Sequence, residues 1–170
     1  MYIEFLLITG DYFKTINKKI FVYEWIFPIL ITFLCAYLGC ILSFEIFEKF
    51  KESSINILGV LLGFSIAVIT IITTGSGKNL EEIKKIKTNI VIGGTKISLY
   101  DLLLINFTYS VILEVLLIIS CLTMPLINKI IFFSFDLKLF FYSMMVFIVL
   151  HILLLTLRNI TDFYLIITKK

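Results

Sequence analysis

Four long apolar segments dominate the chain and alternate with short polar ones. They cover residues 25–44, 55–74, 102–126 and 139–158, and each reaches the length of about 20 residues that a helix needs to cross a bilayer. None of them alternates apolar and polar residues in the manner of a membrane-barrel strand. The pattern predicts an all-α membrane protein in which residues 1–170 form a single domain with four transmembrane helices.

The composition supports this assignment. Of the residues, 60% are hydrophobic and 16% are charged, and the mean hydropathy is +1.08. Soluble domains are typically about 45–50% apolar and about 25% charged. Cys35, Cys40 and Cys121 all lie within apolar segments, which favours packing residues over a disulfide framework or a metal site.

Basic residues are distributed unevenly over the ends and loops. Residues 1–24, the loop 75–101 and the C-terminal end from Arg158 hold eleven lysines and arginines, whereas the other two loops hold four. Because cytoplasmic segments carry the excess of positive charge, we predict that both termini and the loop 75–101 are cytoplasmic. The expected arrangement is a multi-pass membrane protein with these segments on the cytoplasmic side.

The segment before the first span allows two interpretations. Tyr12, Phe13, Ile16 and Ile20 fall roughly on one helical face, with the lysines mostly off it. This arrangement predicts an interfacial helix on the inner leaflet. The same residues could instead extend the first span inward.

The loop 75–101 is predicted to hold a short charged helix, "NLEEIKKIK", and a β-hairpin whose turn is Gly93-Gly94. Its start, "GSGK", looks like part of a phosphate-binding loop. The pattern fails because Asn79 follows the lysine and a helix, not a strand, precedes the glycines. The glycines are therefore expected to end the second span.

The same loop is strongly basic, with five lysines in about twenty residues. They are Lys78, Lys84, Lys85, Lys87 and Lys96. In an oligomer they would form a ring that attracts an anionic nucleotide or oligonucleotide, or a cytosolic partner protein. Alternatively, they only set the topology and contact anionic lipids of the bilayer.

Small residues line one face of the second span at Gly59, Gly63 and Ala67. Such faces let helices approach closely in a membrane. The row packs the first two spans within one subunit, or it joins subunits. We predict a homo-oligomer, with a tetramer as the expected state.

Polar residues also occur inside the third and fourth spans. Asn106, Ser110 and Glu114 share one face of the third span, and His151 lies at a similar depth to Glu114 in the fourth. Charged groups inside a membrane are costly and often functional. Glu114 and His151 are expected to pair and hold a monomeric bundle together, or to face a water-filled path for ions.

No catalytic constellation is apparent in the sequence. His151 is the single histidine, and no spacing of metal ligands occurs. We expect no enzymatic activity, no cofactor and no metal site.

The short termini, the second span "LLGFSIAVITIITT" and the charged exit helix "NLEEIKKIK" together give an architecture that resembles membrane effectors of bacterial antiphage defence. Kiwa-type and Hailong-type membrane subunits are examples. The resemblance implies a homo-oligomer, often a tetramer, whose channel or membrane disruption is triggered by a cytosolic partner or a nucleotide signal.

Three functions follow as hypotheses. The first is an oligomeric channel-like effector or sensor, gated from its cytoplasmic loop. The second is a non-conducting interaction or immunity protein that recruits a soluble partner. The third is a holin-like protein, which would not need a structured hairpin.

The predicted topology can be tested by labelling cells with a membrane-impermeant maleimide. In variants that lack Cys35, Cys40 and Cys121, Lys51→Cys should be labelled from outside, and Lys85→Cys should react only after permeabilisation. The opposite pattern would reverse the orientation.

Overall fold

The computed structural model describes residues 4–39, 44–130 and 135–168. Within these residues, four helices are long and apolar enough to cross a membrane, as the sequence predicts. These candidate spans are Lys18–Leu38, Glu48–Thr74, Leu99–Ile127 and Leu137–Leu165.

The membrane-length helices extend beyond the apolar segments at most of their ends. They are formed by α3 (Phe27–Gly39), which continues the shorter turns before it, by α4 (Phe44–Thr74), α6 (Leu99–Ile130) and α7 (Phe135–Thr168). Extra turns keep backbone groups hydrogen-bonded past the end of the apolar pattern. The first span begins earlier than predicted, near residue 18. Residues 40–43 of its predicted end lie outside the described residues, and Phe44, predicted as its last residue, begins α4.

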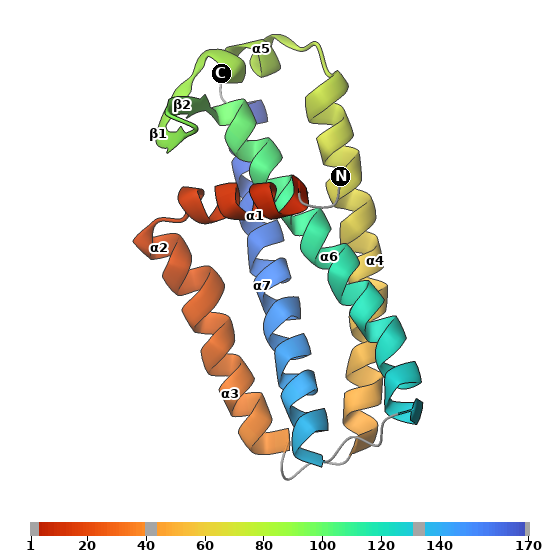
Figure 1. The fold of residues 1–170 in the computed structure, drawn as a ribbon. Coiled ribbons are helices and arrows are strands. Elements are labelled where there is room, and N and C mark those ends of the chain that lie inside the picture. The colour runs from red at the N-terminus through yellow and green to blue at the C-terminus, as the bar shows by residue number, and fades with distance from the viewer. Residues whose placement is uncertain (1–3, 40–43, 131–134, 169–170) are drawn as a thin grey trace.

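The segment before the first span divides at Asn17. Helix α1 (Glu4–Thr15) lies across the bundle, whereas α2 (Lys18–Phe21) and the π-helical turn η1 (Val22–Ile26) lead directly into α3 (Figure 1). The side chain of Asn17 caps α2 by accepting a hydrogen bond of 2.9 Å from the backbone of Ile20. Hence α1 is a separate crossing helix, and only the residues after Asn17 extend the span.

The loop between the second and third spans contains the predicted helix and hairpin. Helix α5 (Lys78–Lys85) is followed by the antiparallel strands β1 (Lys87–Ile92) and β2 (Thr95–Ser98). Gly93 and Gly94 form the turn with φ angles of +59° and +80°, values that favour glycine. The hairpin and α5 lie at the end of the bundle where α4 ends and α6 begins, which we call the loop side (Figure 1).

A reciprocal cap fixes the start of α6 after the hairpin. Asp101 Oδ2 accepts a hydrogen bond of 2.9 Å from the Ser98 backbone, and Ser98 Oγ accepts one of 3.1 Å from the Asp101 backbone. At the end of α4, a side chain in place of Gly75 would collide with the carbonyl oxygen of Ile71. A residue other than glycine at position 75 would therefore require the end of α4 to shift.

The four membrane-length helices do not form a symmetric bundle. Helix α6 packs against both α4 and α7, whereas α3 packs along α7 and not along α4. Figure 1 shows α3 on the far side of α7 from α4. The interior is therefore built mainly from α4, α6 and α7.

The small-residue face of α4 points away from this interior. Gly59, Gly63 and Ala67 are exposed, and a methyl group added at either glycine would meet no atom within 4 Å. The expectation that this row packs the first two spans within one subunit is wrong, because α3 lies against α7. Contact between subunits remains the use that such a face allows.

This face can be tested by adding bulk. If it joins subunits, Gly63→Leu should lower the assembled fraction in native mass spectrometry from mild detergent. Thr161→Leu adds a similar side chain at an exposed position of α7 and should assemble like the parent. Equal behaviour of the two variants would exclude the α4 face as an interface.

Candidate functional site

Six buried polar side chains form a column inside the bundle, which we call the polar column. Its members are Ser65 on α4, Asn106, Ser110 and Glu114 on α6, and Thr156 and Asn159 on α7. All are at most 3% exposed. The residues on α6 follow one another at intervals of four, and those on α7 at an interval of three, so each set occupies one helical face.

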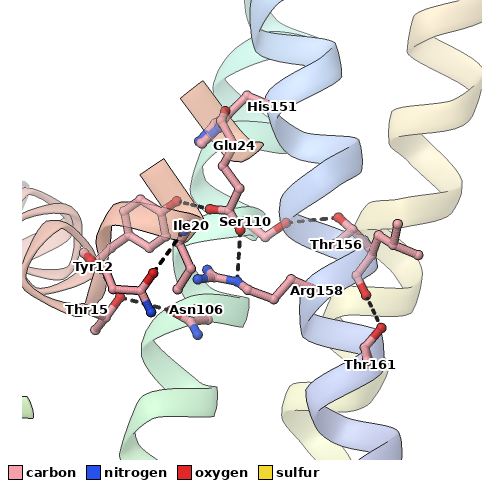
Figure 2. A network of polar contacts seen from close by, with 12 residues as sticks. Tyr12, Thr15, Ile20, Glu24, Asn106, Ser110, His151, Thr156, Arg158 and Thr161 are labelled. Carbon is pink, nitrogen blue, oxygen red and sulfur yellow. Dashed lines mark hydrogen bonds and ion pairs between the residues drawn. The ribbon is translucent and has the colours of Figure 1, made fainter. Parts of the chain in front are cut away.

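Glu114 lies at the end of the polar column that is farther from the loop side. Its Oε1 atom accepts hydrogen bonds from Ser110 Oγ at 2.9 Å and from Ser65 Oγ at 3.3 Å. Ser110 Oγ also lies 3.4 Å from Thr156 Oγ1 (Figure 2). Three helices thus bring a carboxyl group and three hydroxyl groups together.

Some buried polar atoms of the column have no hydrogen-bond partner. They include Glu114 Oε2 and both amide atoms of Asn159. A buried polar atom without a partner is costly, and in a native protein it often indicates a bound water or ion. These atoms are therefore available to interact with a bound water molecule or ion.

His151 is not part of this column, and it does not pair with Glu114. Its Nδ1 atom lies 2.7 Å from the backbone oxygen of Glu24, and its Nε2 atom lies 3.4 Å from the Tyr109 hydroxyl. The expected Glu114–His151 pair is wrong because depth alone does not fix direction. His151 is five residues from Thr156 on α7, which corresponds to about 140° around the helix axis.

A second group, of two buried side chains and the partly buried Arg158, ties α1 to the first and fourth spans. Tyr12 donates a hydrogen bond of 2.6 Å to Glu24 Oε2, and Arg158 Nε lies 2.9 Å from Glu24 Oε1 (Figure 2). The second contact is an ion pair and not a hydrogen bond, because the N–H of Arg158 is not directed at the oxygen. We call Tyr12, Glu24 and Arg158 the α1 latch.

Aromatic contacts enclose the latch. The ring of Tyr12 stacks on Tyr109 at 3.7 Å between centroids, and the guanidinium group of Arg158 lies 5.9 Å from the centre of the Tyr12 ring. Burial raises the pKa of the Tyr12 phenol, and the hydrogen bond to Glu24 adds to this effect. The phenol thus stays protonated and can donate to the carboxylate.

The π-helical turn η1 contributes the backbone of Glu24 to the same region. A carbonyl oxygen only accepts hydrogen bonds, so Nδ1 of His151 must carry the proton in this contact. Nε2 is then free to accept from the Tyr109 hydroxyl. Such π-helical turns are frequent at functional sites.

The sequence did not single out the latch. Glu24 and Arg158 fall at the ends of the predicted spans, where charged residues normally meet water. The available signal was an acid at the start of the first span and a base at the end of the fourth. In antiparallel helices, the start of one and the end of the other lie at one level.

The five loop lysines are all exposed, as a ligand-binding role would need. Lys84 pairs with Glu81 at 2.9 Å and lies 5.3 Å from the centre of the Tyr100 ring. Its ammonium group lowers the pKa of the Glu81 carboxyl. This pair is a surface contact and contributes little to stability.

Comparison of the chain with protein-family models, with curated proteins and with solved structures gives no match. Within the described residues, no three histidine, cysteine or acidic side chains lie together as metal ligands.

The latch predicts a specific energetic difference between two tyrosines. Tyr12→Phe should lower the free energy of unfolding by about 1.5–3 kcal/mol, because it removes a hydrogen bond to a buried carboxylate. Tyr23→Phe, at a tyrosine that is 70% exposed, should have almost no effect. Titration with SDS in mixed micelles measures both, and equal losses would contradict the latch.

Proposed function

We propose that the chain is the subunit of an oligomeric channel-like membrane effector or sensor that is gated through its cytoplasmic loop. The observation that carries this proposal is the polar column, which contains an acidic residue deep inside a membrane-length helix. Polar and ionisable groups in such positions are usually retained for the passage or sensing of ions.

Two apolar clusters lie at the two ends of the polar column. The loop-side seal consists of Val68, Ile72, Ile83, Leu103 and Phe107. The far seal consists of Leu58, Leu117, Cys121, Val149 and Ile152. On α6, Leu103 precedes Asn106 by three residues and Leu117 follows Glu114 by three, so the seals continue the face that carries the column.

This arrangement supports a closed state. A narrow apolar constriction excludes water and ions, and channels use such constrictions as gates. The polar column would conduct or sense ions only when a seal opens. The column lies inside one subunit, so a path through it would not need residues from a second copy.

The loop-side seal offers a route for a signal. Ile83 is the member contributed by α5, and it is 4% exposed. Lys84 and Lys85, next to it in α5, are exposed. A ligand that binds these lysines and displaces α5 would withdraw Ile83 from the seal.

We propose that the ligand is an anionic nucleotide or oligonucleotide, or a cytosolic partner protein. The exposed lysines Lys78, Lys84, Lys85, Lys87 and Lys96 support this part of the proposal. Assembly through the exposed face of α4 would bring several copies of the loop together. The proposed setting, antiphage defence at the bacterial inner membrane, depends on the architectural resemblance.

Loosening the loop-side seal should produce a leak. We expect Ile83→Thr to raise ion flux from liposomes in the absence of any activator, because a hydroxyl group would hydrate the constriction. Ile86→Thr is the matched control, since Ile86 lies at the end of α5 and is 45% exposed. Dye-reported flux from reconstituted protein measures both.

The same assay separates the receiver of the signal from the gate. Adding Lys84→Glu and Lys85→Glu to the Ile83→Thr variant should leave the leak intact, because the seal acts after the lysines. Flux from Ile83→Thr that equals the flux from Ile86→Thr would count against this gate. An absence of flux under all conditions would favour a non-conducting interaction protein.

A further inference from the structure

The oxygen-lined end of the polar column has the features of a cation site. Glu114 is fully buried, and its Oε2 atom has no partner among the described residues. The hydroxyl groups of Ser110 and Ser65 donate to its other oxygen at 2.9 Å and 3.3 Å, and the Thr156 hydroxyl lies 3.4 Å from that of Ser110. We propose that Glu114, Ser65, Ser110 and Thr156 bind a monovalent alkali-metal cation, such as Na⁺.

The donor atoms decide the class of ion. Carboxylate and hydroxyl oxygens are hard ligands, which suit alkali and alkaline-earth cations more than transition metals. The nearby softer ligands are engaged elsewhere. His151 contacts Glu24 and Tyr109, and Cys121 lies 3.5 Å from the sulfur of Met145.

The charge of the site favours a single positive charge. Within the described residues, Glu114 forms no ion pair, and the arginine of the α1 latch is paired with Glu24. One bound Na⁺ would neutralise one carboxylate, whereas a divalent ion would leave an uncompensated positive charge in a region of low dielectric constant. An isolated charge in such a region is very costly.

The hydroxyl groups can coordinate a cation and still keep their present hydrogen bonds. A hydroxyl donates one hydrogen and keeps lone pairs that can face a metal ion. Ser65 and Ser110 both donate to Glu114 Oε1 and so could present their lone pairs on the opposite side. On α7, Asn159 lies one turn closer to the loop side than Thr156, and its buried amide oxygen has no hydrogen-bond partner among the described residues.

This inference deepens the proposed function, because it names the ion that the polar column would hold. It is tested by equilibrium binding and not by flux. In lipid nanodiscs, the thermal unfolding midpoint of the parent should rise and saturate as NaCl replaces choline chloride at constant ionic strength, which keeps electrostatic screening the same. Glu114→Gln should remove this dependence.

Conservative variants make the test independent of any loss of stability in the Gln variant. Ser65→Ala and Ser110→Ala should each weaken Na⁺ binding by about tenfold or more, because each removes a ligand, and loss of even an outer-shell partner costs about that much at other metal sites. Ser120→Ala, at an exposed serine of the same helix that bonds to the Leu116 carbonyl, should bind Na⁺ like the parent.

Two results would overturn the inference. One is a midpoint that is the same in Na⁺ and choline at every pH, which would assign a proton to Glu114. The other is Na⁺ binding that persists in Glu114→Gln. Na⁺ binding without flux in liposomes would support the cation site and contradict the channel function. Flux without Na⁺ binding would support the channel function and contradict the cation site.

Discussion

The cost of an unpaired polar group in a membrane-length helix constrains most of this structure. Polar side chains on α6 and α7 cannot face hydrocarbon without a large loss of solvation free energy. Most of them find partners only if those helices pack with the polar faces together and if α4 and α1 supply further hydrogen bonds, whereas Asn159 has no partner among the described residues. Ser65 from α4 and Thr15 from α1 are such partners, the latter donating to Asn106 at 3.5 Å.

The same constraint explains why α3 lies apart from α4. The first span carries its single buried acid, Glu24, near its beginning, and the base that compensates it, Arg158, is on α7. Pairing these charges requires α3 to lie along α7. Since α4 pairs with α6, the small-residue face of α4 has no partner within the subunit.

Much of this architecture could be predicted from the sequence. The four spans, the short helix in the loop and the Gly93-Gly94 turn follow from local patterns with clear physical causes. The direction of side chains around each axis could not be predicted, because it depends on which helices are neighbours. Glu114 and His151 illustrate the limit: counting residues gave them a common depth, but their partners lie in different directions.

The polar column and the α1 latch both include residues of helix α7, so a movement of α7 affects both of them. His151 and Arg158 face α1 and the first span, whereas Thr156 and Asn159 belong to the polar column. A helix with intact backbone hydrogen bonds moves as a unit, so a displacement of α1 that rotates α7 must also change the spacing between Thr156 and Ser110. The latch and the column are therefore coupled through one rigid element, although no described hydrogen bond joins Glu24 to Glu114.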